Sequence, residues 1–296
     1  MRDDFCVFIL SHGRPDRQYT LNVLKKEGYT GKVYIVIDNE DKTEPEYRKR
    51  YGNMVVQFDK LAVSKTFDTG DLEEDRRTIV YARNACFDLA RKVGCKYFLE
   101  LDDDYTYFSF KRLCNGNFHN IHATQLDRAF EAMLNFLENS PRITSICFAQ
   151  GGDFIGGAQG ESFKKAVKRK VMNSFFCSVD RPFQFLGRIN EDVNTYTTLA
   201  TRGVLFYTIL GMSLNQQETQ HNAGGMTDVY KDRGTYLKSF YSVMFCPSAV
   251  KISTMGGAGN GVCYHRIHHN VKWNNCAPLV IDERWKKNDA RTAGKL

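Results

Sequence analysis

The chain has 296 residues, of which 42% are hydrophobic and 25% are charged, so it can form a substantial core and has the charge content of an ordinary soluble protein. No apolar run approaches the roughly 20 residues of a membrane-spanning helix, and the acidic start does not read as a secretory signal. Nine cysteines without a Cys-x-x-Cys pair argue against a zinc ribbon or a disulfide framework and for reduced thiols in the cytoplasm, and the net charge of +7 permits a polyanionic partner without demanding one.

Strands and helices alternate through the first third of the sequence. Apolar segments over residues 5–10, 32–37 and 53–58 predict strands. Helices are expected over residues 16–27 and 79–93, and a glycine follows each of them as a stop signal. Because strands that alternate with helices are typical of βαβ units, this part of the chain predicts a parallel sheet.

The second half of the sequence is less regular. Apolar side chains at helical spacing predict an amphipathic helix over residues 125–138, and strands are expected over residues 143–149, 174–179 and 204–212. We find no internal repeat and no low-complexity linker. One α/β domain over residues 1–296, with an elaborated C-terminal half, is therefore favoured over two small domains.

A strand that runs into three acidic residues is the most informative feature of the sequence. Residues 97–101 have the length and composition of a buried strand, and Asp102, Asp103 and Asp104 follow it. Carboxylates gathered in this way repel one another unless a hard cation such as Mg²⁺ or Mn²⁺ lies between them, with phosphate oxygens as further ligands. The pattern predicts a metal-bound diphosphate at a strand end, where open α/β sheets bind ligands. The alternative is a solvated acidic turn.

Polar residues also follow two other predicted strands. Parallel strands end at one edge of a sheet, so these residues and the acidic triplet are expected to converge on one cleft. Ser11 and the backbone of Gly13 could hold a nucleotide there, and Arg14 could bind a phosphate through its bidentate fork. Asp38 could accept a hydrogen bond from a ribose hydroxyl or from a base N–H.

Basic residues gather at two further places. Arg76, Arg77 and Arg83 precede the acidic triplet and are candidates for contact with a diphosphate, although a solvated surface charge explains any one of them equally well. Residues 164–170 are the densest positive run of the chain. This run could follow the phosphates of a nucleic acid, and a solvated lysine-rich face is the alternative.

An acidic pair, Glu191-Asp192, lies in otherwise apolar and neutral sequence. A carboxylate beside the expected cleft could act as a general base that deprotonates an acceptor hydroxyl. An acidic pair at the start of a helix, where it favours the macrodipole, is an equally good interpretation of these two residues alone.

A glycine-rich segment, residues 256–261, precedes three histidines: His265, His268 and His269. This pattern predicts a mobile loop that delivers an imidazole to a metal ion. Zinc is the weaker alternative, because no matching cysteine pair accompanies the histidines.

These residues together resemble the GT-A class of nucleotide-sugar glycosyltransferases, whose α/β fold is Rossmann-type with a mixed, mainly parallel sheet. The matching features are the loop 11–14, Asp38, Ala-Arg-Asn at 82–84, the DxD-type triplet 102–104 and the pair 191–192. The resemblance covers roughly residues 5 to 270. It is greatest to the TET-associated glycosyltransferases of bacteriophages, through Phe-Ile-Leu-Ser-His-Gly-Arg-Pro, Leu-Asp-Asp-Asp-Tyr and Gly-Arg-Ile-Asn-Glu-Asp-Val.

The resemblance implies that residues 1–110 bind a nucleotide sugar, such as a UDP-sugar. The residues implied in donor binding are Ser11, His12, Gly13, Arg14, Asp38, Arg77, Arg83, Asp102 and Asp103. Asp102 would face the ribose and the metal, and Asp104 would bind Mn²⁺ or Mg²⁺. Asp103 is an alternative ligand, and His265 or His268 would complete the metal shell.

Residues 111–296 would bind the acceptor by the same resemblance. Asp192, next to Glu191, would activate the acceptor hydroxyl and give inversion at the anomeric carbon. The family is thought to glycosylate hydroxymethylpyrimidines such as hydroxymethylcytosine in DNA, so the implied function is metal-dependent transfer of a hexose or pentose to phage DNA in the host cytoplasm. A protein or glycan acceptor is one alternative. A non-catalytic nucleic-acid-binding protein is another, against which the triplet argues, since bare carboxylates repel a polyanion.

Overall fold

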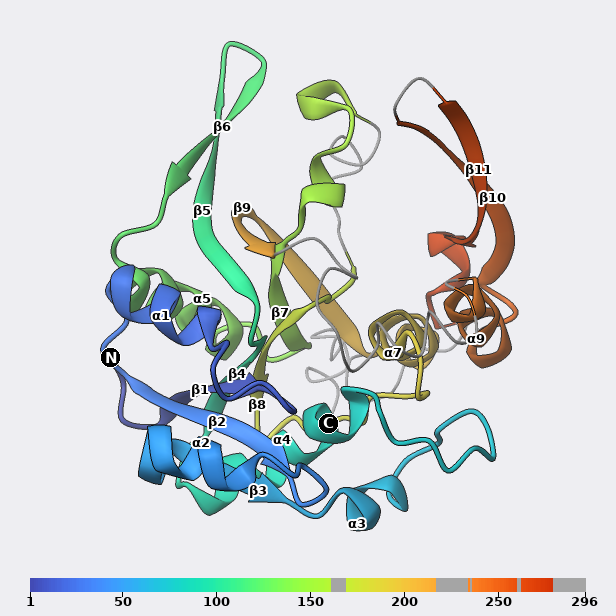
Figure 1. Ribbon diagram of the computed structural model, residues 1–296. Coiled ribbons are helices and arrows are strands. Elements are labelled where there is room, and N and C mark those ends of the chain that lie inside the picture. Colours follow the sequence, from blue (N-terminus) through green and yellow to red (C-terminus); the bar gives the residue numbers. More distant parts are fainter. Residues whose placement is uncertain (161–168, 217–233, 235, 260–261, 279–296) are drawn as a thin grey trace, which may run out of the picture.

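The computed structural model describes residues 1–160, 169–216, 234, 236–259 and 262–278 (Figure 1). A nine-stranded sheet forms the centre of the molecule. Its strands follow in the order β3 (Val55–Phe58), β2 (Lys32–Asp38), β1 (Phe5–Leu10), β4 (Tyr97–Asp102), β8 (Ser174–Ser178), β7 (Ile143–Ala149), β9 (Leu205–Gln216), β5 (Tyr105–Cys114) and β6 (Asn117–His122). The prediction of a mixed α/β fold around one large sheet is confirmed.

The sheet combines a parallel part and a mixed part. β3, β2, β1 and β4 pair in parallel, with Leu10 opposite Asp102 and Asp38 opposite Phe58. β8 runs antiparallel to β4 and β7, β7 is parallel to β9, and β5 is antiparallel to β9 and β6. The carboxyl ends of the four N-terminal parallel strands therefore lie at one edge, as the alternating sequence pattern predicted.

Helices cover both faces of the parallel part, which explains why its strands read as continuous apolar runs. Every residue of β1 is buried. Its odd-numbered residues pack with α1 (Tyr19–Lys26) and α5 (Leu126–Glu138), and its even-numbered residues pack with α4 (Val80–Lys92). The core thus has two layers, one on each side of the sheet.

The remaining elements lie around this centre (Figure 1). They are the helices α2 (Glu44–Tyr51), α3 (Lys60–Ser64), α7 (Glu191–Ala200) and α9 (Leu237–Phe245), the 3-10 turns η1 (Gly52–Met54), η2 (Gly151–Phe154), η3 (Gly157–Gln159) and η4 (Trp273–Asn275), and an antiparallel pair of strands, β10 (Val250–Gly259) and β11 (Val262–Val271). The β5–β6 and β10–β11 hairpins project from the same side of the molecule. Within the described parts of the chain, no helix has the length and apolar character needed to cross a membrane.

The prediction of a glycine-rich loop before the histidines is wrong for the described part of that segment. Residues 256–259 belong to β10, and residues 260–261 lie outside the described residues. Gly256 pairs with His265 across the hairpin, and a Cβ added at Gly256 would meet the imidazole at 3.5 Å. The imidazole of His265 therefore covers Gly256, which has no side chain of its own. An aromatic ring over a glycine of the neighbouring strand stabilises that strand.

Candidate active site

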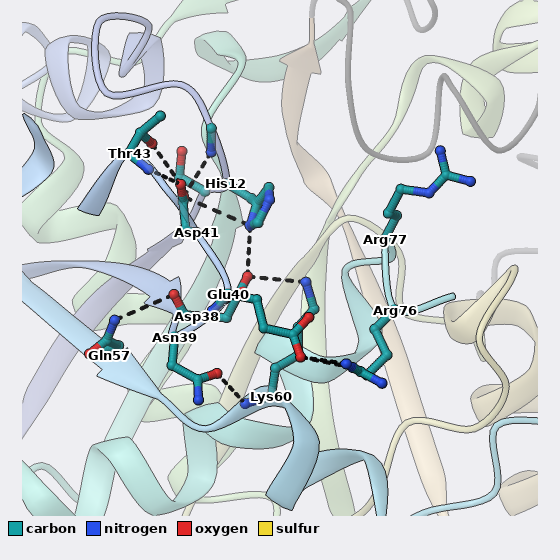
Figure 2. Close-up of polar contacts among 12 residues, drawn as sticks. His12, Asp38, Asn39, Glu40, Asp41, Thr43, Gln57, Lys60, Arg76 and Arg77 are labelled. Atoms are coloured by element: carbon teal, nitrogen blue, oxygen red, sulfur yellow. Dashed lines mark hydrogen bonds and ion pairs between the residues drawn. The ribbon is translucent and has the colours of Figure 1, made fainter. Parts of the chain in front are cut away.

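Asp38 is the centre of a charged cluster at the end of β2 (Figure 2). His12 Nδ1 lies 2.8 Å from Asp38 Oδ2, and Lys60 Nζ donates to the same oxygen at 3.2 Å. Burial alone would raise the pKa of Asp38, but the hydrogen bond from His12 and the charge of Lys60 outweigh it and hold that pKa below its usual range. Asp38 is therefore a charged acceptor, and the half-exposed imidazole of His12 lies on its solvent side.

Asp41 holds the loop after β1 against the loop after β2. Its Oδ2 accepts from Gly13 N at 2.8 Å, and its Oδ1 accepts from the backbone and hydroxyl of Thr43 at 2.8 and 2.6 Å. Gly13 has a φ of +69°, a left-handed conformation that residues with a side chain rarely adopt. The glycine thus allows the turn that presents its N–H to Asp41.

Asp103, the middle residue of the acidic triplet, is directed into the protein. It is only 1% exposed, accepts from Ser11 Oγ at 2.6 Å and pairs with Arg14 Nη2 at 3.1 Å. Burial raises the pKa of Asp103 to about 7, although Arg14 and Ser11 oppose that rise. Tyr47 and Gln18 also contact Ser11 Oγ, at 2.6 and 2.8 Å. Asp103 therefore fastens the β1 loop to the end of β4, so its carboxylate is already engaged by protein groups.

The tight turn between β4 and β5 places Asp102 and Asp104 on either side of Asp103. Thr20 holds this turn, because its Oγ1 donates to the carbonyl of Asp102 at 2.6 Å and accepts from Tyr105 N at 3.0 Å. Gln216 Nε2 donates to Asp104 at 3.1 Å. Burial and the neighbouring charge of Asp102 raise the pKa of Asp104 to about 6.

Asp102 and Asp104 fit a hard cation by their chemistry. Both supply carboxylate oxygens, the donors that Mg²⁺ and Mn²⁺ prefer. Burial and then the charge of Asp102 raise the pKa of Asp104, and a cation would offset that charge. No group of three or more His, Cys, Asp or Glu residues in the described chain could hold a metal ion by itself. A site of two carboxylates would therefore depend on donor phosphate oxygens and water for its other ligands, which is usual for Mg²⁺.

The predicted histidine ligands lie on β11 and have other neighbours. His268 stacks on His269 with ring centroids 4.4 Å apart. Burial and the charges of Lys238 and Arg266 lower the pKa of His268. The ring of His265 covers Gly256. The structure thus does not bring either predicted histidine together with the carboxylates at the end of β4.

Arg83 joins the end of β4 to the acidic pair. Its guanidinium donates to Asp102 Oδ1 at 3.2 Å and to Glu191 Oε1 at 3.0 Å, and its Nη1 lies 3.7 Å from Glu100 Oε2. Burial lowers the pKa of Arg83, but the three carboxylates outweigh burial and raise it overall. Arg83 is 2% exposed and packs over the ring of Phe175 at 4.5 Å. Arg83 thus bridges the half-buried Asp102 to Glu191, and a contact with the donor diphosphate stays a prediction.

The other two candidate arginines also have carboxylate partners. Arg77 pairs with Asp75 at 2.9 Å, and Arg76 pairs with Glu40 at 2.7 Å. Figure 2 shows Arg76 directed toward the Asp38 cluster through Glu40, whereas Arg77 points away from it.

Glu191 and Asp192 begin α7, as the helix-start interpretation predicted, and both are buried. Burial raises the pKa of Glu191 to about 7 and also raises that of Asp192. Asp192 Oδ1 accepts from Val193 N at 2.7 Å, and Lys170 and Lys238 are close enough to stabilise its charge. A position at a helix start does not exclude a catalytic role, because the bridge through Arg83 brings this pair to the carboxylates of β4.

Several residues that shape the site were missed from the sequence. Lys60 and Gln216 come from distant elements, and no sequence pattern links them to Asp38 or Asp104. Arg188 belongs to the quoted Gly-Arg-Ile-Asn-Glu-Asp-Val segment, but only the structure shows that it is fully buried and paired with Asp71 at 2.9 Å and Glu73 at 2.8 Å. The sequence does carry a signal for Arg188, because a basic residue stands there in an otherwise apolar segment just before Glu191.

Most of the predicted lysine-rich run, namely residues 164–168, lies outside the described residues. Its last two members are directed inward. Arg169 donates to the carbonyl of Trp273 at 2.8 Å, and Lys170 pairs with the buried Asp153 at 2.5 Å. These two cations are therefore engaged within the protein.

Comparisons with known proteins give one family match. A family model described as TET-Associated Glycosyltransferase matches residues 5–225, which is more than half of the chain. No curated protein sequence gives a significant match.

Solved structures with a similar fold have low sequence identity. The mannosyltransferase PcManGT from Pyrobaculum calidifontis, in complex with GDP-Man and Mn²⁺, is 11% identical, with 83% of this chain and 74% of that chain covered and a TM-score of 0.46. S. aureus TarS 1–349 is 12% identical, with 81% and 65% covered and a TM-score of 0.40. A second structure of S. aureus TarS is also 12% identical, with 80% and 39% covered and a TM-score of 0.41.

Proposed function

The chain belongs to the TET-associated glycosyltransferase family, and from this premise we propose that it transfers a sugar from a nucleotide-sugar donor to hydroxymethylated pyrimidines in DNA, with a divalent metal ion. The observation that carries the proposal is the bridge Asp102–Arg83–Glu191, whose central arginine is buried. This bridge fixes the donor-side carboxylates and the acidic pair relative to each other, and a single displacement requires such an arrangement, because donor and acceptor must be aligned.

The donor would bind at the edge formed by the ends of β1, β2 and β4. Asp38 would accept from the ribose or the base, with His12 beside it, and residues 1–110 would form this half of the site. Asp102 and Asp104 would hold Mn²⁺ or Mg²⁺ together with the diphosphate oxygens. When bound, the metal would neutralise the charge of the departing nucleoside diphosphate. UDP is our expected nucleotide.

Asp192 would act as the general base for the acceptor. Its carboxylate would take the proton of the hydroxymethyl group while that oxygen forms a bond to the anomeric carbon and the bond from this carbon to the diphosphate breaks. Burial raises the pKa of Asp192, which makes it a stronger base than an exposed aspartate. Attack opposite to the leaving group would give inversion.

The test combines donors, metal and acceptors in one experiment. The protein is incubated with a panel of nucleotide sugars, with Mn²⁺ or a chelator, and with hydroxymethylated or plain DNA, and the mass of the DNA bases is measured. We expect a sugar-sized mass increase only with hydroxymethylated DNA and metal. Transfer to a protein or a free glycan, with none to hydroxymethylated DNA, would contradict the acceptor. Transfer at full rate in chelator would contradict the metal.

A further inference from the structure

Both hairpins lie in long segments that contain no acidic residue, although the chain has 34 in total. These are residues 105–125 and residues 233–281. The first contains the β5–β6 hairpin, and the second contains α9 and the β10–β11 hairpin. Figure 1 shows both hairpins projecting from the same side of the molecule. Surfaces that lack carboxylates and carry cations are typical of proteins that bind a polyanion.

One face of the β10–β11 hairpin is basic. Ser253 lies opposite His268, and Met255 lies opposite Arg266. Side chains alternate along a strand and opposite residues share a face, so Lys251, Arg266 and His268 lie on the same face. Lys251 and Arg266 are exposed.

This basic face reaches the proposed catalytic base through α9, which packs against both strands. Burial and the charge of Arg266 lower the pKa of Lys238 on α9, while Asp192 opposes that shift. Burial, Lys238 and Arg266 also lower the pKa of His268. Positive side chains are thus crowded beside Asp192, and an anion bound there would relieve their repulsion.

The β5–β6 hairpin has one face packed on the protein and one face whose side chains are exposed. On the packed face, Lys111 lies over the ring of Phe154 at 4.6 Å. The other face carries Phe110, Arg112, His119 and Ile121, because Phe110 pairs with Ile121 and Arg112 pairs with His119. Phe110 is 41% exposed and Ile121 is 46% exposed. A cation among exposed apolar side chains suits a single strand of nucleic acid, whose phosphates bind cations and whose bases stack.

We propose that the two hairpins are arms that hold the sugar-phosphate backbone of the acceptor DNA. Lys238 and Arg266 would contact phosphates next to the nucleotide that reacts at Asp192, and Lys251 would contact the next phosphate along the β10–β11 arm. Arg112 would contact a phosphate on the other arm. This inference rests on the proposed function, since it assigns the surface by which that same site receives its acceptor. The extruded base of a duplex or the unpaired base of a single strand would then lie beside Asp192.

Binding measured against salt concentration tests the arms directly. A variant with Lys251→Ala, Arg266→Ala and Arg112→Ala is compared with wild type on a hydroxymethylated single-stranded oligonucleotide. Each lost phosphate contact reduces the slope of log affinity against log salt concentration by about 0.7, so the triple variant should lose about 2 units. The matched control is Lys49→Ala with Arg50→Ala, two exposed cations on α2, away from the hairpins (Figure 1), and its slope should equal that of wild type.

Two further measurements separate the possible failures. Calorimetric affinity for the nucleotide sugar reports whether the variant is folded, and it should equal that of wild type. If the triple variant is folded, still glycosylates DNA and has an unchanged salt slope, the hairpins do not bind the DNA backbone. The proposed function would not be affected by that result. A wild-type protein that transfers no sugar to hydroxymethylated DNA, while the triple variant loses its slope, overturns the proposed acceptor and supports the arms as a polyanion-binding surface.

Discussion

Asp102 and Asp104 carry the two carboxylates that we expect to hold the metal ion. Asp102→Asn and Asp104→Asn should each abolish transfer and weaken Mn²⁺ binding, because each removes one negative charge from a two-carboxylate site. The fold should survive, since asparagine keeps an oxygen that can accept from Arg83 or Gln216. Turnover and Mn²⁺ affinity measure the effect, and circular dichroism checks the fold. Either variant at full turnover in metal-free buffer would rule out the metal assignment.

Asp192→Asn separates chemistry from binding. If Asp192 is the base, turnover should fall by roughly 10²–10⁴-fold, the usual contribution of general-base catalysis. Nucleotide-sugar affinity, measured by calorimetry, should stay nearly unchanged, because we propose that the donor binds at the ends of β1, β2 and β4. An affinity that falls in parallel with turnover would instead assign Asp192 to substrate binding or to structure, and a product with retained anomeric configuration would contradict single displacement.

The raised pKa of Glu27 predicts that the free energy of unfolding depends on pH, independently of catalysis. Glu27 is the buried residue at the C-terminal end of α1, it accepts from Phe108 N at 3.1 Å, and burial raises its pKa to about 7. Its folded-state pKa lies above its ordinary value near 4.5, so the carboxylate destabilises the fold above pH 7, and this cost disappears as the pH falls toward 4.5. Glu27→Gln keeps an acceptor for Phe108 N. Its melting temperature should exceed that of wild type at pH 8, and the difference should shrink toward pH 5. An equal difference at both pH values would contradict the raised pKa.

At the scale of residues, the sequence indicates candidate acidic residues more readily than the side chains that pair with them. Asp38, Asp102 and the pair at the start of α7 became candidates because acidic residues next to apolar segments stand out in a sequence. Their partners did not, since the bond from Arg83 to Glu191 joins positions 108 residues apart. The inward direction of Asp103 was equally hidden, because it depends on Ser11 and Arg14 in another loop.

At the scale of elements, buried strands were predictable and exposed hairpins were not. β1 and β7 have the predicted bounds, because each consists mainly of apolar residues that are buried in the sheet. The β5–β6 hairpin lacks this pattern, since its outer half is exposed. Its turn did carry a signal: Asn115 and Gly116 both have positive φ, as a two-residue hairpin turn requires, and Asn-Gly is the preferred pair for that turn.

Helix α5 offers a matched test of packing. Phe130 is fully buried and lies within 5.3 to 6.4 Å of the rings of five aromatic residues, whereas Phe136 on the same helix is 41% exposed. Phe130→Ala should lower the free energy of unfolding by about 3–5 kcal/mol through lost burial and a cavity. Phe136→Ala should cost much less. Urea unfolding measures both, and similar losses for the two variants would contradict this account of the core.

At the scale of the molecule, one sheet joins both halves of the sequence. β4 pairs with β1 on one side and with β8 on the other, and β5 pairs with β9. A fragment of residues 1–124 would therefore expose the edges of β4 and β5, and we expect it to aggregate or stay unfolded. Gel filtration and circular dichroism of the fragment measure this. A soluble, folded fragment that binds a nucleotide sugar would show that the donor half is an independent domain.

The same strand order has a consequence for synthesis on the ribosome. β4 leaves the exit tunnel long before β8, and β5 long before β9, so two apolar strand edges stay unpaired while the intervening chain is translated at roughly 5–20 residues per second. Native pairing cannot be completed until Gln216 has emerged. During those seconds the nascent chain is a natural client for chaperones that bind exposed strands, so its yield in cells should depend on their supply as well as on the stability of the finished protein.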